Sequence, residues 1–485
     1  MAVTQTLLGE RKILLGGEDV ETDESYEIRS PYDGTPLAVV HRAGPAEVER
    51  AIADAVDAFD TTRRLPSWRR EQVLEAVAAG IAAAREELAR TIALEAGKPI
   101  RTARVEVDRA AFTFSVAAEE SKRIYGEIVP LDWLPGNEGR EALIRRVPLG
   151  PVTGITPFNF PLNLVAHKVA PALAAGNPIL LRPATQTPCS SLALGRILLE
   201  AGWPEHAIAV LPCSTDTARP LVEDDRIKLL TFTGSPAVGW TLKARAGRKR
   251  VTLELGGNAA VIVNDDADVA YAAERVAWGG FAYAGQTCIS VQRVYVHEQV
   301  YDEFARELVR RVEALVVGDP LDETTDVGPV IDRSNAERID QWLEEAKAAG
   351  ATVLSGGERD GNLWQPTVVE GAPAEARVSC EEVFAPFVGL HRFADVREAI
   401  DAAGRSEFGL QAGLFTNDLR IVEDAFDRID VGGLMVNDVS TFRIDHMPYG
   451  GVKSSGFGRE GLRYAIEEMT ELKLLTTNRS RPTTA

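Results

Sequence analysis

The chain has 485 residues, a net charge of −19 at pH 7, and 45% hydrophobic and 26% charged residues. This is ordinary globular composition with about three domains' worth of chain, and the acidity argues against nucleic acid, because phosphate binding requires a basic face. The four cysteines have no Cys-x-x-Cys spacing. We therefore expect no disulfide framework and no metal site, but a lone thiol can be catalytic.

The N-terminal region predicts strands followed by helices. The first 40 or so residues predict strands around a turn at residues 30–34. Apolar residues three and four apart then predict helical structure from residue 45 to about 93, and a further helix over 101–124, with Gly97-Lys98-Pro99 between them. The start lacks the apolar core of a signal peptide, and no apolar stretch reaches the ~20 residues of a membrane helix. We expect a cytoplasmic protein with no membrane partner.

The rest of the chain predicts a hairpin and then alternating strands and helices. Residues 126–149 combine prolines and glycines with an alternating run, which indicates a protruding hairpin. Apolar runs at 178–181, 208–211 and 229–232 are each followed by a helical pattern, and further strands are expected at 260–263, 294–297 and 472–477. This alternation predicts parallel βαβ units, hence an α/β fold with two parallel-sheet domains and a small bridging domain.

Cys288 is the first candidate for chemistry. It stands in Gly285-Gln286-Thr287-Cys288, where the glycine permits a tight turn and a close approach of substrate to the backbone. A thiolate attacks a carbonyl carbon well when its pKa is lowered or a base assists it. The alternative is a small buried apolar side chain.

Glu254 is the second candidate. It stands in Leu253-Glu254-Leu255-Gly256-Gly257, and burial of a carboxylate within an apolar run is costly. A raised pKa would suit Glu254 to general-base work on water or on the thiol. The alternative is a partly exposed glutamate at a strand end.

Two turns are candidates for binding charge. Residues 232–239 follow an apolar strand and open a helix, so free amides around Gly234, Ser235 and Gly239 can attract phosphate; the alternative is an ordinary strand-to-helix turn. Residues 156–161 form a proline-bounded turn that can present the Asn159 amide to a developing oxyanion. The alternative there is a purely structural turn.

Taken together, these motifs resemble the aldehyde dehydrogenase superfamily. The matching segments run in family order from Glu95-Ala96-Gly97-Lys98-Pro99 to Gly456-Phe457-Gly458-Arg459-Glu460, so the resemblance covers nearly the whole chain. It places the family base on Glu254, the nucleophile on Cys288 and the oxyanion donor on Asn159. The family's nicotinamide-ribose segment corresponds to residues 381–386, and its C-terminal glycine pattern to residues 448–456.

The resemblance implies NAD(P)-dependent oxidation of an aldehyde to its acid. Cys288 adds to the aldehyde, Asn159 and the Cys288 amide stabilise the oxyanion, hydride leaves to the nicotinamide, and Glu254 activates water against the thioester. Lys168 matches a family lysine near this site, the alternative being a surface ion pair. The cofactor-binding residues that the resemblance implies are Thr156, Phe158, Arg182, Thr185, Gly234, Ser235, Gly239, Glu382 and Phe384.

Two departures from the family pattern stand out. Many members have Lys-Pro-x-Glu where this chain has Arg182-Pro183-Ala184-Thr185, which removes a glutamate that would repel a 2′-phosphate. Arg182 can pair with phosphate in a fork, so NADP is expected to be admitted; alternatively Arg182 replaces the lysine on the ribose of NAD. Tyr283-Ala284 stands where many members have asparagine, with an effect that the sequence leaves open.

The family layout also predicts an unusually polar aldehyde tunnel. Its expected lining is Arg109, Phe160, Asn163, Leu164, His167, residues 438–447 with Arg443, and Tyr449. A buried arginine facing a pocket requires an anion or several acceptors, which suggests a short aldehyde carrying a hydroxyl, phosphate or carboxylate. Residues 161–168 look like those of lactaldehyde and non-phosphorylating glyceraldehyde-3-phosphate dehydrogenases. The alternative is that Arg109 and Arg443 form structural salt bridges, for instance with Asp108 or Asp445.

The rival functions are a coenzyme A-acylating semialdehyde dehydrogenase, an inactive binding or structural member of the fold, and a thiol hydrolase without nicotinamide. Glu254 favours hydrolysis, and Glu382 and Phe384 favour nicotinamide. The family layout predicts a dinucleotide-binding domain over residues 1–125 and 150–253 and a catalytic domain over 254–437. Residues 126–149 and 465–485 are expected to form an oligomerisation arm, giving a homodimer or homotetramer.

Overall fold

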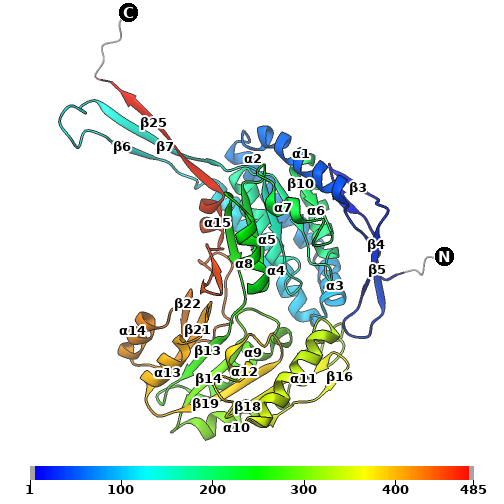
Figure 1. The fold of residues 1–485 in the computed structure, drawn as a ribbon, viewed down its shortest axis with the longest axis vertical. Helices are drawn as coiled ribbons and strands as arrows, with labels where there is room; N and C mark the ends of the chain where they lie inside the picture. Colours follow the sequence, from blue (N-terminus) through cyan, green and yellow to red (C-terminus); the bar gives the residue numbers. More distant parts are fainter. Residues whose placement is uncertain (1–5, 480–485) are drawn as a thin grey trace, which may run out of the picture.

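Two large sheets form the body of the protein, and a smaller sheet projects from it as an arm (Figure 1). The structure, a computed structural model, describes residues 6–479. Both large sheets are built mainly from parallel strands with helices packed on them, which confirms the predicted α/β class. Within residues 6–479, no helix combines the length and the apolarity that crossing a bilayer requires.

The first large sheet has eight strands in the order β24-β12-β11-β8-β9-β10-β2-β3. Its central strands are buried on both faces, as parallel strands covered by helices are. The strands are β2 (Ile13–Leu15), β3 (Glu18–Val20), β8 (Val152–Ile155), β9 (Ile179–Arg182), β10 (Ile208–Val210), β11 (Leu229–Thr233), β12 (Arg250–Glu254) and β24 (Gly456–Phe457). The helices of this half are α1 (Pro45–Thr62), α2 (Ser67–Ala83), α3 (Arg85–Ala96), α4 (Ile100–Ser121), α5 (Asn163–Ala175), α6 (Cys189–Glu200), α7 (Arg219–Glu223), α8 (Pro236–Arg245) and α15 (Leu462–Glu468).

The second large sheet has seven strands in the order β15-β18-β19-β14-β13-β21-β22. The strands are β13 (Ala259–Val263), β14 (Val291–His297), β15 (Thr352–Ser355), β18 (Thr367–Glu370), β19 (Phe387–Phe393), β21 (Gln411–Phe415) and β22 (Gly433–Val436). The helices are α9 (Val269–Phe281), α10 (Tyr301–Glu313), α11 (Arg333–Ala348), α12 (Arg377–Cys380), α13 (Val396–Gly404) and α14 (Leu419–Arg428). The predicted domain boundaries stay a prediction.

The helical region predicted over residues 45–93 is divided into three helices. Pro66 precedes α2 in an extended conformation, and Ala84 separates α2 from α3. Proline disfavours the helical conformation of the residue before it and has no N–H to continue the hydrogen-bond ladder, so the apolar periodicity carries on while the helix does not.

The arm is an antiparallel sheet of β6 (Glu127–Pro130), β7 (Arg140–Pro148) and β25 (Thr470–Asn478). The predicted hairpin is confirmed, and β25 pairs with β7 along its whole length, from Thr470 opposite Pro148 to Asn478 opposite Arg140. In Figure 1 this sheet stands away from the body, with β25 alongside β7. A second small sheet joins β1 (Gly9–Arg11), β5 (Pro36–His41) and β4 (Ser25–Arg29) near the N-terminus.

The sheet order explains where a site can form. β8, β9, β11 and β12 run parallel, so the loops that follow their carboxyl ends gather at one edge of the sheet. Glu254 is the last residue of β12, and the turn holding Asn159 follows β8. Cys288 lies between α9 and β14 of the other sheet, so the two halves of the body meet at the candidate site.

Candidate active site

Cys288 follows a segment of left-handed backbone. Tyr283 and Ala284 have φ of 50° and 52°, and Gly285 has φ of 65°. A Cβ at residue 285 would collide with the carbonyl oxygen of Ala385, so only glycine fits there. Positive φ is strained for tyrosine and alanine, and strain of this kind is concentrated at functional sites because surrounding contacts must enforce it.

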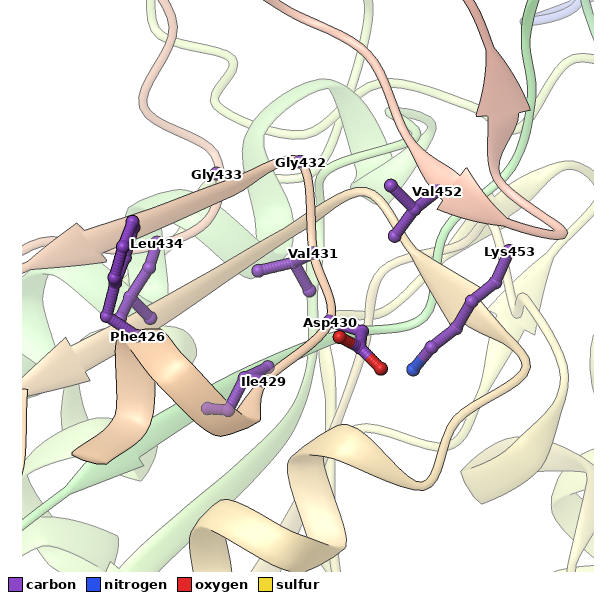
Figure 2. A pocket seen from close by; sticks show the side chains of 9 residues that line it. All are labelled: Phe426, Ile429, Asp430, Val431, Gly432, Gly433, Leu434, Val452 and Lys453. Atoms are coloured by element: carbon purple, nitrogen blue, oxygen red, sulfur yellow. The ribbon is translucent and has the colours of Figure 1, made fainter. Parts of the chain in front are cut away.

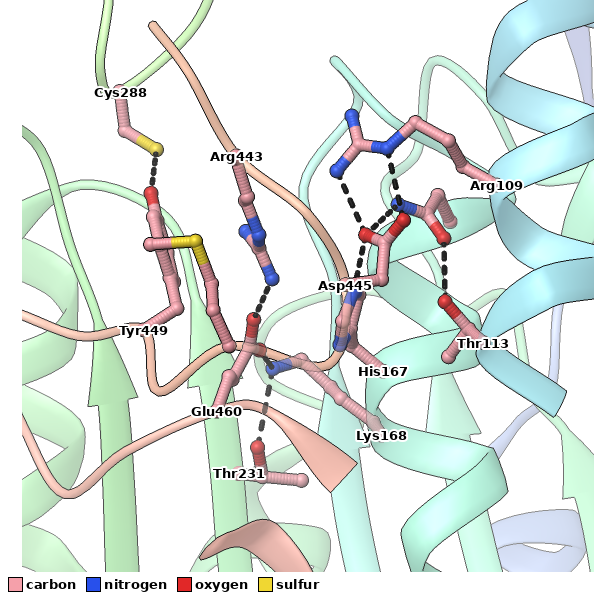
Figure 3. A network of polar contacts seen from close by, with 12 residues as sticks. Arg109, Thr113, His167, Lys168, Thr231, Cys288, Arg443, Asp445, Tyr449 and Glu460 are labelled. Atoms are coloured by element: carbon pink, nitrogen blue, oxygen red, sulfur yellow. Dashed lines mark hydrogen bonds and ion pairs between the residues drawn. The ribbon is translucent and has the colours of Figure 1, made fainter. Parts of the chain in front are cut away.

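The Cys288 thiol is half-buried and contacts the hydroxyl of Tyr449. The Cys288 Sγ to Tyr449 Oη distance is 2.9 Å (Figure 3). Burial raises the pKa of Cys288 to about 12, although the Tyr449 hydrogen bond and the Arg443 charge act in the opposite direction. The thiol is therefore protonated at neutral pH in this arrangement, and its use as a nucleophile requires a base.

Glu254 is buried and its carboxylate is unpaired. Its exposed fraction is 4%, and neither carboxylate oxygen has a hydrogen-bond partner among residues 6–479. Burial and then the charge of Glu460 raise the pKa of Glu254 well above its usual range, against the charges of Arg443 and Lys168. The alternative of a partly exposed strand-end glutamate is wrong, and a buried carboxyl of raised pKa has the properties of a general base.

Asn159 lies against the loop that carries Cys288. Its Nδ2 donates to the carbonyl oxygen of Gln286 at 2.9 Å, and the side chain is buried. Gln286 is itself held from the other side, since its Oε1 accepts from the Ile331 N–H and its Nε2 donates to the Pro329 carbonyl. The turn after β8 and the nucleophile loop are thus joined by a direct hydrogen bond.

Lys168 belongs to a buried network rather than to a surface ion pair. Its Nζ donates to Thr231 Oγ1 at 3.1 Å and to Glu460 Oε1 at 3.3 Å (Figure 3). The other oxygen of Glu460 accepts from Arg443 Nη2 at 3.0 Å. Burial would raise the pKa of Glu460, but the Lys168, His167 and Arg443 charges outweigh it and lower the pKa to about 2. Sequence reasoning missed Glu460, although it ends the Gly456–Glu460 motif.

Asp445 organises the other wall of the site. It is buried and accepts two hydrogen bonds from Arg109, at 3.0 and 2.7 Å, one from Asn163 Nδ2 at 3.1 Å and one from His167 Nε2 at 2.8 Å. The alternative pairing of Arg109 with Asp108 is wrong, because Asp108 binds Arg85 instead.

A cavity of about 130 Å³ opens onto Cys288. Among the residues that line it are Arg109, Phe160, Asn163, Leu164, Cys288, Arg443 and Tyr449, together with Tyr283 and Trp278. Six of the seven expected tunnel positions thus meet at the thiol. The prediction that His167 lines the cavity is wrong. His167 lies buried behind the cavity wall, because its ring is hydrogen-bonded to Asp445.

Larger hollows lie elsewhere. A hollow of about 430 Å³ beside β22 is lined by nine residues, including Phe426, Asp430 and Lys453 (Figure 2). It contains no thiol or imidazole, so the small cavity at Cys288 remains the candidate site.

The expected cofactor residues line the edge of the first sheet. The Thr156 N–H donates to the Arg182 carbonyl, which joins the ends of β8 and β9. Arg182 Nε is buried with no partner among residues 6–479, and Thr185 is exposed.

The start of α8 presents free backbone donors. Ser235 is its N-cap and makes no side-chain capping hydrogen bond, while the N–H of Gly234 donates to the Glu254 carbonyl. Gly239 packs so closely on Leu255 that a Cβ would collide with it, which seats α8 against β12. A ten-residue helix with uncapped amides fits a phosphate.

Phe384 lies near Phe158, and Glu382 lies near Gly257. Glu382 Oε1 accepts the Gly257 N–H at 2.9 Å, and burial raises its pKa to about 7. Phe384 has φ of 51° and packs edge-on against Phe158, with ring centroids 5.9 Å apart. The uncapped start of α8 and the partly exposed Arg182 at the end of β9 fit a dinucleotide.

Comparisons with known proteins agree with this site. The sequence model of the Aldehyde dehydrogenase family matches residues 19–475. A 3-sulfolactaldehyde dehydrogenase of Priestia aryabhattai is 45% identical over 467 residues, covering 96% of this chain and 98% of the relative. The solved structure of aldehyde dehydrogenase 21 from Physcomitrella patens, in complex with the reaction product succinate, is 43% identical with a TM-score of 0.96, covering 99% of this chain and 100% of that one. Glyceraldehyde-3-phosphate dehydrogenase GapN from Methanocaldococcus jannaschii, complexed with NADP, is 38% identical with a TM-score of 0.91, covering 94% and 100%.

The chain therefore belongs to the aldehyde dehydrogenase family. It is an oxidoreductase, an NAD(P)-dependent aldehyde dehydrogenase, and the resemblance drawn from its motifs is confirmed. The expected cofactor, NAD or NADP, is likewise confirmed by the family and by neighbours complexed with NADP.

Proposed function

We propose that this enzyme oxidises a short aldehyde that carries an anionic group, a carboxylate, sulfonate or phosphate, with or without a 2-hydroxyl. The observation that carries the proposal is the presence of two arginines, Arg109 and Arg443, in the small cavity that ends at Cys288. The cavity volume supports a short substrate, and the arginines support an anionic group on it.

Both arginines retain donors for a ligand despite their ion pairs. Arg109 uses Nε and Nη2 on Asp445, and its Nη1 donates to no residue between 6 and 479. Arg443 uses Nη2 on Glu460, and its buried Nε has no partner among the same residues. The buried Arg443 Nε–H without an acceptor is costly, and Arg109 Nη1 belongs to a partly exposed side chain and can donate to a ligand, so an anionic group in the cavity is supported by both arginines. The salt bridges foreseen as the alternative are present, and they orient the arginines rather than occupy them fully.

The relatives support the same class of substrate. One is named for 3-sulfolactaldehyde, and one structure holds succinate as its reaction product. Both compounds are short and carry an anionic group away from the reacting carbon.

In the proposed reaction, Cys288 acts as nucleophile and Asn159 as oxyanion donor. The thiol loses its proton to Glu254, directly or through a water, and Sγ adds to the aldehyde carbon. The resulting oxyanion accepts hydrogen bonds from Asn159 Nδ2 and the Cys288 N–H. The hydride acceptor is NAD(P)⁺, when it is bound. Loss of hydride from the substrate carbon leaves the substrate attached to Cys288 as a thioester.

Hydrolysis then depends on Glu254. Glu254 first releases the thiol proton to solvent. Its carboxylate then removes a proton from water, the water oxygen attacks the thioester carbon, and the C–S bond breaks to release the acid and the thiolate. Lys168 and Arg443 keep Glu460 ionised through their ion pairs. Their two positive charges balance the negative charges of Glu460 and Glu254. The presence of Glu254 favours hydrolysis over transfer to coenzyme A, the rival reaction.

Two further features belong to the proposal. Thr185 is exposed and carries no charge to repel a 2′-phosphate, and the partly exposed guanidinium of Arg182 supplies a positive charge near it, which supports acceptance of NADP. The arm exposes Leu472, Leu474 and Leu475 on β25, an apolar strip that supports assembly of copies into a homodimer or homotetramer.

The test is a panel of aldehydes followed by nicotinamide reduction, with NAD and NADP in parallel. Lactaldehyde, glyceraldehyde 3-phosphate, succinate semialdehyde and hexanal span the alternatives. We expect anionic aldehydes to exceed hexanal by about tenfold or more in kcat/KM. A preference for hexanal would assign Arg109 and Arg443 to structural roles only.

A further inference from the structure

Lys98 is a buried cation that the proposed reaction does not use. It lies in the Gly97–Pro99 segment between α3 and α4, and its side chain is fully buried. Burial of an ammonium group is costly unless it is paired, so such a residue requires a reason. Its neighbours supply one.

Three groups surround the ammonium. Lys98 Nζ forms an ion pair with the buried carboxylate of Glu106 on α4. It also lies 3.6 Å from the ring centroid of Phe160 and 4.3 Å from that of Tyr283. Burial lowers the pKa of Lys98 to about 8, with the Glu106 charge opposing the shift. Two aromatic faces and a carboxylate thus replace the water that the cation has lost.

The partners of Lys98 belong to different parts of the site. Phe160 directly follows Asn159, the proposed oxyanion donor. Tyr283 lies in the left-handed segment ahead of Cys288, and its hydroxyl donates to the Ala96 carbonyl at 2.8 Å. The two rings also meet edge to face, with centroids 6.2 Å apart.

Glu106 extends the same contact to α5. Its Oε1 accepts the backbone N–H groups of Leu162 and Asn163, at 3.0 and 3.2 Å, where the Asn159 turn runs into the helix. The Lys98–Glu106 pair therefore fixes both the start of α5 and the ring beside Asn159. A misplacement of catalytic groups by about 1 Å can lower a rate by about 10²-fold, so such a support affects turnover.

We propose that Lys98 is a positioning residue, which holds the Asn159 turn in place against the nucleophile loop through Phe160, Tyr283 and Glu106. The inference rests on the proposed role of Asn159. It also gives a reason for tyrosine at residue 283, whose ring supplies the second aromatic face of the ammonium's site.

The test is a double-mutant cycle with Asn159. The neutral-pair variant combines Lys98→Met with Glu106→Gln, so that no carboxylate is left buried alone. In the otherwise unchanged enzyme we expect it to lower kcat by about 10- to 100-fold. In an Asn159→Ala background, where the positioned donor is gone, we expect a loss below about 3-fold. Equal losses in both backgrounds would overturn the proposal, because Lys98 would then act elsewhere.

Further measurements separate positioning from general damage. The rate of Cys288 alkylation and its pH profile should stay unchanged, because the thiol's hydrogen-bond partner is Tyr449 and the nearby charge that lowers its pKa is Arg443, neither of which is changed; a parallel fall would overturn the proposal. Lys98→Arg should restore much of kcat. The control removes a partly exposed lysine–glutamate pair between the C-cap of α4 and helix α2, Lys122→Met with Glu71→Gln, and should leave kcat within about twofold.

Two other outcomes of the cycle also have a defined meaning. If the neutral-pair variant does not fold, Tyr283→Leu takes its place in the same cycle with the same expectation, and additivity there would overturn the proposal. An Asn159→Ala enzyme with normal kcat would instead remove the oxyanion role on which the inference rests, an outcome distinct from a failure of Lys98.

Discussion

Replacement of Arg109 by methionine should separate anionic from neutral aldehydes. Arg109 lines the cavity at Cys288, and two of its three nitrogens are held by Asp445. The substitution keeps much of the side-chain volume and removes the charge. Asp445 keeps its hydrogen bonds from His167 and Asn163, so the wall of the site remains anchored.

The size of the effect follows from the remaining donor. A hydrogen bond to a charged group contributes about 1.5–3 kcal/mol. The Arg109 side chain is 26% exposed, so solvent screens part of this interaction and about 1–2 kcal/mol remains. The value of kcat/KM for succinate semialdehyde should therefore fall roughly 5- to 30-fold, and that for pentanal should change less than about 3-fold.

The assay compares initial rates of nicotinamide reduction with the two aldehydes. Their ratio cancels general damage to the enzyme. Arg104→Met is the matched control: Arg104 lies on the same helix, is 25% exposed and pairs with Glu86 and Glu323, outside the cavity lining. An unchanged ratio in Arg109→Met would refute the anion-binding role of this residue.

The remaining predictions concern hydrolysis, pH, cofactor and assembly. Glu254→Gln should slow thioester formation, because the Cys288 proton must then pass to water, and should slow hydrolysis still more, so that reduced nicotinamide rises to about one per active site and then nearly stops; steady turnover would contradict the base role. The same variant should unfold about 1–3 °C higher at pH 8, since a carboxyl whose pKa is raised in the folded state destabilises that state above its unfolded pKa; an unchanged or lower Tm contradicts this. Wild-type kcat should rise with pH through the alkaline range, because the pKa values of Glu254 and Cys288 are both raised and the deprotonated forms react; a rate that falls there would contradict it. Thr185→Glu should raise KM for NADP about tenfold or more relative to NAD, and a constant ratio would argue against the 2′-phosphate site. Leu474→Lys with Leu475→Lys should lower the mass measured by light scattering, and an unchanged mass would exclude the β25 strip from the interface.

The fold could be predicted from the sequence because the patterns that indicate strands and helices are local. The apolar runs of β9, β11 and β13 and the helical periods between them are read within ten residues, and the parallel arrangement follows from their alternation. The arm was recognisable from its prolines and glycines. The breaks at Pro66 and Ala84 were harder to place, because the apolar period continues across them.

The site was predictable only where a residue stands in a motif. Cys288, Glu254 and Asn159 lie in short, recognisable segments. The partners of Arg109 and His167 do not, since Asp445 is 336 residues from Arg109 and 278 from His167 along the chain. The contact of Lys98 with Phe160 and Tyr283 similarly depends on the meeting of three distant segments.

The central claim, a thioester on Cys288 that Glu254 hydrolyses, is tested most directly by mass spectrometry of the Glu254→Gln enzyme after mixing with succinate semialdehyde and NADP. We expect an added acyl group on the peptide containing Cys288, and none in an enzyme that also carries Cys288→Ser. An acyl group on another residue, or acid production by Cys288→Ser, would contradict the claim.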